Sequence, residues 1–263
     1  MRRYIVPAMG SKQRSTSLPP PFLKRIWLPN ADGQDAPDWA SYPFSLPLIR
    51  GLDLQFDKPV TILVGDNGTG KSTLLEALAH HAGFSDAGGA QGMRAVGHGR
   101  ASASDAGSLG AKLRGSWLPQ VKQGWFFRAE TFFSVARYLD EAAMDAGEAG
   151  PNYLAASHGE GFVDFFEERM SRQGIYILDE PEAALSPQKQ FEFLKLLRRI
   201  QYANNAQVIM ATHSPILMAL PDAALWQMEQ FGMRPVALED TAHFRLYREF
   251  ALYPHETVEA MIE

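Results

Sequence analysis

The sequence contains no cysteine in its 263 residues. This excludes a disulfide framework and a metal site built on thiolates. No window reaches the roughly 18 consecutive apolar residues that a membrane-spanning helix needs. The first residues also lack the apolar core of a signal peptide. Together these absences predict a cytoplasmic protein with no intrinsic membrane segment.

Acidic residues are absent from residues 1–30, which hold six lysines and arginines, although the whole chain has a net charge of -5. The run "LPPP" also falls in this region. We expect residues 1–21 to form a basic, flexible arm and residues 22–263 to form the folded domain. The arm could touch nucleic acid or an acidic partner, or it could be a solvated tail.

Three apolar runs rich in β-branched residues predict buried parallel strands: "PVTILVG" (59–65), "GIYILD" (174–179) and "AQVIMA" (206–211). A helix is expected to follow the first run and to end near Gly83. Another should begin at Pro187, because Ser186 suits the N-cap and proline suits the first helical position. Strands that alternate with helices indicate an α/β fold with a mostly parallel central sheet.

The remaining segments carry weaker patterns. Residues 22–56 suggest an N-terminal antiparallel β region with loops, and residues 83–110 suggest a long irregular segment because Gly, Ala and Ser dominate them. Helical patterns at about 133–145 and 159–172 indicate a small helical subdomain at about 133–172. The C-terminal residues 243–263 look like one or two helices.

The segment "GDNGTGKS" (65–72) matches the phosphate-binding pattern G-x-x-x-x-G-K-[ST] between a strand and a helix. Backbone N–H groups of such a loop turn toward a phosphate, and the helix N-terminus adds partial positive charge. Lys71 would reach the β- and γ-phosphates, and the Ser72 hydroxyl would bind Mg²⁺. The expected nucleotide-binding residues here are Gly65, Asp66, Asn67, Gly68, Thr69, Gly70, Lys71, Ser72 and Thr73.

Two other strand ends carry polar residues at the edge where ligands bind in α/β sheets. Asp179 ends the second strand and suits the metal, while Glu180 could polarise an attacking water. The third strand runs into His213, whose neutral imidazole could hydrogen-bond a γ-phosphate. We therefore expect Glu180, His213 and Lys71 to be catalytic. The absence of a guanine-reading [NT]-K-x-D motif favours ATP over GTP.

These motifs, "GDNGTGKS", "LDEP" and "THS", together resemble the ATP-binding-cassette superfamily of ATPases. In that family a signature segment contacts the γ-phosphate held by a second protomer, and closes a head-to-tail dimer around two ATP. "ASHGEGF" lies where the signature is expected and is similar to a degenerate form of it. The resemblance implies that Ser157 and Gly159 serve the partner's nucleotide, in an ATP-dependent homodimer.

The resemblance is less complete at two places. The family has a glutamine near "GWFFRAETFF", where this chain offers Glu130 or Arg128. The resemblance places Glu130 at the metal, whereas a buried strand with a salt bridge explains the same residues. The family also stacks adenine on an aromatic residue before the phosphate loop, and the candidates are Trp27, Tyr42 and Phe44.

The form "DEPEAALSP" departs from the one common in transporter subunits and is similar to that of stand-alone ATPases related to the SMC, RecF and OLD groups. We therefore predict an ATP hydrolase that works as a nucleotide-driven switch on DNA or a protein partner, in DNA maintenance or defence. The alternatives are the nucleotide-binding subunit of a transporter, and a slowly hydrolysing assembly module. A neighbouring gene rich in membrane spans would favour the transporter.

Overall fold

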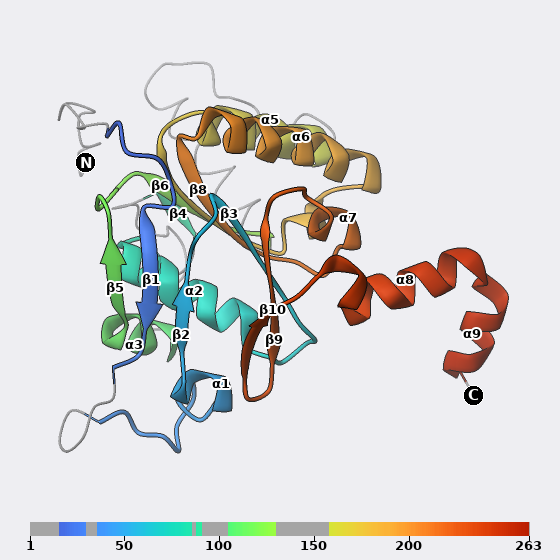
Figure 1. The fold of residues 1–263 in the computed structure, drawn as a ribbon, viewed down its shortest axis with the longest axis horizontal. Helices are drawn as coiled ribbons and strands as arrows, with labels where there is room; N and C mark the ends of the chain where they lie inside the picture. Colours follow the sequence, from blue (N-terminus) through green and yellow to red (C-terminus); the bar gives the residue numbers. More distant parts are fainter. Residues whose placement is uncertain (1–15, 30–35, 86–87, 91–104, 130–157, 263) are drawn as a thin grey trace, which may run out of the picture.

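The computed structural model describes residues 16–29, 36–85, 88–90, 105–129 and 158–262. Within these ranges a central sheet of seven strands organises the molecule (Figure 1). In spatial order its strands are β10 (Gly232–Pro235), β9 (Ala224–Glu229), β3 (Val60–Val64), β8 (Ala206–Ala211), β7 (Gly174–Asp179), β6 (Gly124–Arg128) and β4 (Gly89–Ala90). Strands β9 to β6 in this order are parallel, and the edge strands β10 and β4 are antiparallel to their neighbours. The predicted fold class is confirmed.

Successive residues of each central strand enter opposite apolar layers. Ile62 packs in the layer that contains α5 (His158–Met170) and α6 (Pro187–Ala203), which lie together on one face of the sheet (Figure 1). The next residue, Leu63, packs in the other layer with α2 (Lys71–Ala82). Burial on both faces explains why the three predicted strands read as continuous apolar runs.

A second, antiparallel sheet covers the α2 side and confirms the expected N-terminal β region. Its order is β2 (Asp53–Gln55), β1 (Leu23–Trp27) and β5 (Arg114–Trp117), and the short helix α1 (Pro47–Arg50) precedes β2. Gln207 of β8 joins the two sheets, since its buried carboxamide oxygen accepts the N–H groups of Phe22 and Leu23, each at 2.8 Å. This pairing leaves the buried polar group satisfied.

The expectation of an irregular segment over residues 83–110 was wrong at its end, where α3 (Asp105–Lys112) forms and packs along α2. The reason lies in the small residues themselves. A Cβ added at Gly110 would lie only 2.7 Å from the Ala77 carbonyl oxygen. Glycine weakens a helix taken alone, but here it permits two helices to approach closely.

Two other predicted helices, α5 and α6, are confirmed. Helix α6 begins at Pro187, and the Ser186 side chain accepts the Lys189 N–H at 3.4 Å. Helix α5 confirms the helical pattern at 159–172. The helix expected over 133–145 lies outside the described residues. The hairpin of β9 and β10 was not predicted.

The C-terminus forms two helices, as expected: α8 (Ala242–Leu252) and α9 (Pro254–Ile262). They follow α7 (Pro215–Met218), the β9–β10 hairpin and a short 3₁₀ turn at Leu238–Asp240. We call α8 and α9 the C-terminal helical pair. It extends away from the sheet and contains no buried residue (Figure 1). Among the described helices, none combines the length and apolar character needed to cross a bilayer.

Candidate active site

The loop between β3 and α2 needs its glycines for two different reasons. At Gly65 a side chain would collide with β9, because a Cβ there would lie 2.6 Å from the Met228 carbonyl oxygen. Gly68 and Gly70 instead adopt positive φ values of 80° and 91°, which residues with a side chain rarely adopt. Gly70 is also the N-cap of α2. The glycines that weaken strand and helix therefore create the tight turn that a phosphate requires.

Lys71 lies inside this turn and is buried. Its Nζ donates to the carbonyl oxygens of Gly65 at 2.8 Å and Asp66 at 3.0 Å. Burial lowers the pKa of Lys71, against the opposing effect of nearby carboxylates, with Glu180 first. A cation held by two neutral carbonyl groups is well placed to pair with an anion that enters the loop.

Asp179 meets the phosphate loop from the end of β7. The Ser72 hydroxyl donates to its Oδ1 at 3.1 Å, so residues 107 positions apart in the chain are in direct contact. Asp179 is buried, and this burial raises its pKa to about 6, although the Arg128 charge and the Ser72 hydrogen bond oppose the rise. The predicted metal residues Ser72 and Asp179 thus lie together.

The donor set suits magnesium. Mg²⁺ takes oxygen ligands in an octahedron at about 2.1 Å, so adjacent ligand oxygens lie roughly 3 Å apart. The Ser72 and Asp179 oxygens are separated by 3.1 Å. A cavity of about 270 Å³ adjoins them, lined by Ser72, Arg128, Ala129, Asp179, Glu180, Ala183 and Ala184. The site therefore has both the ligands and the space for an ion that keeps waters and phosphate oxygens.

Arg128 occupies the neighbouring strand end, since β6 pairs with β7 in a register that sets it opposite Asp179. Its Nη1 lies 2.7 Å from Glu76 Oε1, and its Nε lies 3.8 Å from Asp179 Oδ2. A buried strand that ends in ion pairs was one of the two interpretations of this segment. Glu130, the other candidate, lies outside the described residues.

Glu180 and His213 face each other at the ends of β7 and β8. His213 Nε2 lies 3.4 Å from Glu180 Oε1. Glu180 adopts a left-handed conformation with φ 50°, which is uncommon for a residue with a side chain. Strain of this kind persists where the surrounding structure fixes the backbone, and it is frequent at functional sites.

Two residues that sequence reasoning did not assign support His213. The half-buried Glu182 accepts the His213 backbone N–H on Oε1 at 2.6 Å, and desolvation raises the pKa of Glu182. The sequence signal for Glu182 was the unusual acid in "DEPE". His243 of α8 contacts the imidazole, with its Nε2 3.0 Å from His213 Nδ1. No motif marked His243.

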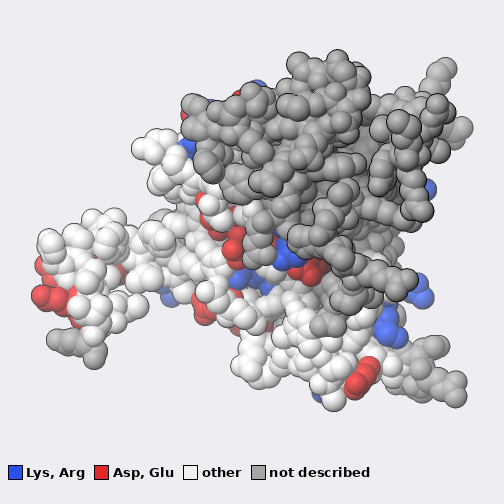
Figure 2. All heavy atoms as spheres, turned by 180° about the vertical axis from the view of Figure 1, so that it is seen from behind, with Lys and Arg blue, Asp and Glu red and all other residues white. Residues whose placement is uncertain are grey.

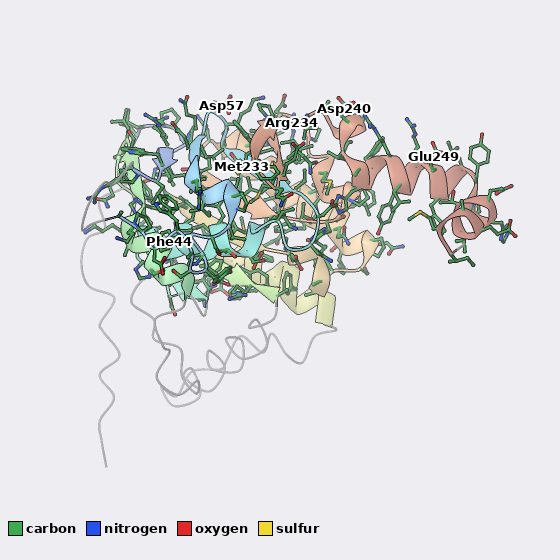
Figure 3. All side chains as sticks on the ribbon, turned by 90° about the horizontal axis from the view of Figure 1, so that it is seen from below. Phe44, Asp57, Met233, Arg234, Asp240 and Glu249 are labelled. Atoms are coloured by element: carbon green, nitrogen blue, oxygen red, sulfur yellow. The ribbon has the colours of Figure 1, made fainter. Side chains whose placement is uncertain are left out.

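The three aromatic candidates for adenine differ in position. The Tyr42 hydroxyl shares a hydrogen bond of 2.6 Å with Thr73 Oγ1, and the residue is 50% exposed. Phe44 is buried in the core on the α2 side (Figure 3). Trp27 lies on β1 beneath the Arg25 guanidinium. Of these, Tyr42 adjoins the phosphate loop.

The two signature residues lie at the edge of the described structure. Ser157 lies outside the described residues, and Gly159 lies in the first turn of α5. Figure 2 shows that lysine, arginine, aspartate and glutamate side chains meet near the middle of one face.

Two features define a P-loop nucleotide-binding domain. One is the glycine-rich loop with its buried lysine. The other is the contact of Ser72 with Asp179, which lies at the end of β7, the second strand along the sheet from β3. Comparisons with known proteins narrow this class. Residues 39–82 match the family model "AAA domain", and residues 161–219 match "AAA domain, putative AbiEii toxin, Type IV TA system". The two matched segments contain the phosphate loop and the Asp179 and His213 strand ends.

Two curated relatives are more specific. The hemin import ATP-binding protein HmuV of Streptomyces coelicolor is 34% identical over 196 residues, which cover 67% of this chain and 68% of that protein. The thiamine import ATP-binding protein ThiQ of Cereibacter sphaeroides is 32% identical over 174 residues, covering 58% and 70%. The chain therefore belongs to the ATP-binding-cassette family of ATPases, and it is an ATP hydrolase of this class.

Solved structures with a similar fold include CbiO1 of Clostridium perfringens, described as part of an ABC transporter complex. Its TM-score is 0.46 at 16% identity, with 91% of this chain and 99% of that chain covered. The SMC head domain of Thermotoga maritima has a TM-score of 0.44 at 15% identity, with 82% and 99% covered. The family assignment rests on the sequence relatives, not on these structures.

Proposed function

We propose that this ATPase binds Mg-ATP at the edge formed by the phosphate loop, Asp179 and His213, and that it hydrolyses the nucleotide in a head-to-tail dimer. One observation carries the site assignment: the Ser72 hydroxyl reaches Asp179 at 3.1 Å, beside the buried Lys71. Because the loop and the strand end are far apart in sequence, their contact is a property of the folded site.

The loop residues would hold the phosphates. Lys71 would exchange its two carbonyl partners for β- and γ-phosphate oxygens, and Tyr42 would stack on the adenine. Main-chain N–H groups and the α2 N-terminus would supply the remaining positive potential. The nucleotide residues in this proposal are Gly65, Asp66, Asn67, Gly68, Thr69, Gly70, Lys71, Ser72 and Thr73.

Ser72 and Asp179 would hold the magnesium ion, which neutralises phosphate charge when bound. Glu130 is the third proposed ligand. Glu180 would accept a proton from the attacking water, and His213 would donate a hydrogen bond to the γ-phosphate. The 3.4 Å separation of His213 Nε2 and Glu180 Oε1 supports this pairing, because both groups would then face the same phosphate.

The dimer follows from the signature segment. Ser157 and Gly159 would contact the γ-phosphate bound to the partner subunit, so ATP would close the dimer and hydrolysis would open it. In this proposal residues 22–263 form the ATPase domain, residues 133–172 carry the signature subdomain and residues 1–21 form the basic arm. The motion would act on DNA or on a protein partner.

A transporter subunit is the second candidate, and the two import ATP-binding relatives favour it. The candidates differ in what should stimulate hydrolysis. Duplex DNA should accelerate a DNA-acting switch, with an effect that fades as salt rises. ATP hydrolysis by a transporter subunit should be unaffected by DNA and should be accelerated by a co-expressed membrane protein. A third candidate, an assembly module, should hydrolyse ATP slowly under both conditions.

Ser72→Ala tests the site itself. Loss of a metal ligand should raise the Mg²⁺ concentration needed for half-maximal ATP hydrolysis by about tenfold or more, in line with roughly 1.5–3 kcal/mol for a contact to a charged group. Ser171→Ala is the control, since Ser171 is exposed in the turn between α5 and the start of β7, the end of that strand opposite to Asp179, and its hydroxyl donates to the Glu168 carbonyl. An unchanged Mg²⁺ requirement in the Ser72 variant would overturn the metal assignment.

A further inference from the structure

His243 and His213 come from separate parts of the chain and form a pair beside Glu180. His213 follows β8 of the central sheet, whereas His243 lies in the first turn of α8. Their rings are 5.0 Å apart between centroids, and His213 Nδ1 lies 3.0 Å from His243 Nε2. Both rings are half-buried. This contact lies opposite the side of His213 that faces Glu180.

Burial favours the uncharged form of both rings. Burial lowers the pKa of His213, and the Lys71 charge lowers it further. Burial also lowers the pKa of His243. A neutral imidazole carries one N–H donor and one acceptor nitrogen, so one hydrogen lies between the two rings. Either His243 donates to His213, or His213 donates to His243.

The two arrangements differ at the nitrogen that faces the site. If His213 donated through Nδ1, its Nε2 lone pair would point at the Glu180 carboxylate 3.4 Å away, and two acceptors would oppose each other. If His243 donates, His213 carries its proton on Nε2, where it can donate to an anion. The two outer nitrogens of the pair, His213 Nε2 and His243 Nδ1, have no hydrogen-bond partner among the described residues, so the nearby Glu180 charge decides between the two arrangements.

We propose that His243 is a positioning residue, which donates to His213 Nδ1 and thereby keeps the His213 proton on Nε2, toward Glu180 and the nucleotide. The proposal deepens the proposed function, on which the γ-phosphate role of His213 rests. The His213 backbone is fixed separately by Glu182. His243 therefore acts on the ring rather than on the main chain.

This contact also connects the active site to the C-terminal helical pair. Thr241 holds the start of α8, since its buried hydroxyl accepts the Phe244 N–H at 3.2 Å and donates to the Leu238 carbonyl at 2.8 Å. Beyond this turn α8 extends away from the sheet, as the position of Glu249 relative to Asp240 shows (Figure 3). A shift of α8 would withdraw the donor from His213.

The direct test is the protonation pattern of His213, read from long-range ¹H–¹⁵N NMR spectra of the nucleotide-free protein. We expect the proton on Nε2 in the wild-type chain. His243→Gln should preserve this pattern, because the glutamine amide can donate from the same position. His243→Leu should lose it. His255→Leu is the control, since His255 is an exposed histidine of α9.

Kinetics give the second readout. His243→Leu should lower kcat for ATP hydrolysis about tenfold, the effect of one lost hydrogen bond, with KM for ATP unchanged. His243→Gln should restore most of the rate. A wild-type His213 protonated on Nδ1, or a leucine variant with unaltered spectrum and kcat, would overturn the proposal. His213→Leu separates the two claims: if it hydrolyses ATP normally, the γ-phosphate role fails while the NMR result for His243 still stands.

Discussion

The nucleotide site and the C-terminal helical pair are built in opposite ways. Lys71 and Asp179 are buried at the edge of a sheet whose two faces are covered by helices, and their backbone is fixed by strands and tight turns. The helical pair has no buried residue, and within the described residues its main contacts with the rest of the chain are those of α8 with α7 and with the 3₁₀ turn before it. Yet His243 of this exposed element reaches a residue of the site. The comparison teaches that a rigid sheet edge can place the reacting groups while a loosely attached helix adjusts one of them.

Lys71→Ala should have the largest effect on the rigid side of this comparison. It removes a cation that we place against two phosphate oxygens, each contact contributing about 1.5–3 kcal/mol. ATP affinity should fall about 1,000-fold, measured by isothermal titration calorimetry. Lys195→Ala, at an exposed position of α6, should bind ATP like the wild type. Equal affinity in both variants would mean that the loop does not hold the nucleotide.

Glu180→Gln should separate binding from hydrolysis. Without a general base, turnover should fall about 100-fold or more, whereas ATP affinity should stay within a few-fold of wild type. The comparison variant is Glu259→Gln on α9, where an equivalent charge is removed from the exposed helical pair. Wild-type turnover in the Glu180 variant would remove this residue from the role of base.

Asp179→Asn should change how stability depends on pH. The pKa of Asp179 is raised from 3.8 to about 6, so the folded protein binds a proton more tightly than the unfolded chain does. Its contribution is therefore fully present below about pH 4 and is lost as pH rises through 6. At pH 7, without nucleotide or metal, the asparagine variant should be more stable than wild type by up to about 3 kcal/mol. Urea unfolding of both proteins at about pH 4 and at pH 7 measures this difference in stability. An equal pH dependence of the two proteins would contradict the prediction.

Phe250→Ala should have the smallest effect, because Phe250 lies on α8 and is 47% exposed. The free energy of unfolding should change by less than about 0.5 kcal/mol. The matched change Phe193→Ala, in the fully buried core between α6 and the sheet, should cost about 3–5 kcal/mol. If Phe250→Ala destabilised the protein as much, the helical pair would belong to the folding core, and the contrast between the two regions would fail.

The sequence predicts most of the nucleotide site because its groups follow from local rules. A continuous apolar run predicts a buried strand, and the polar residues that follow it must lie at one sheet edge, as Ser72 and Asp179 do. Glu182 and His243 were harder to assign, since their roles depend on which backbone N–H or ring a side chain meets across the fold. Helix α3 was missed for a related reason: its small residues favour a loop locally, and only packing against α2 stabilises the helix.

The solution mass of the Glu180→Gln protein, measured by light scattering with and without Mg-ATP, tests the central claim most directly. Trapped ATP should convert a monomer to a dimer, and the added change Ser157→Arg should prevent this while ATP still binds. Repeating the measurement with duplex DNA would show whether DNA shifts the equilibrium further. A protein that binds Mg-ATP but stays monomeric in every condition would contradict the head-to-tail dimer.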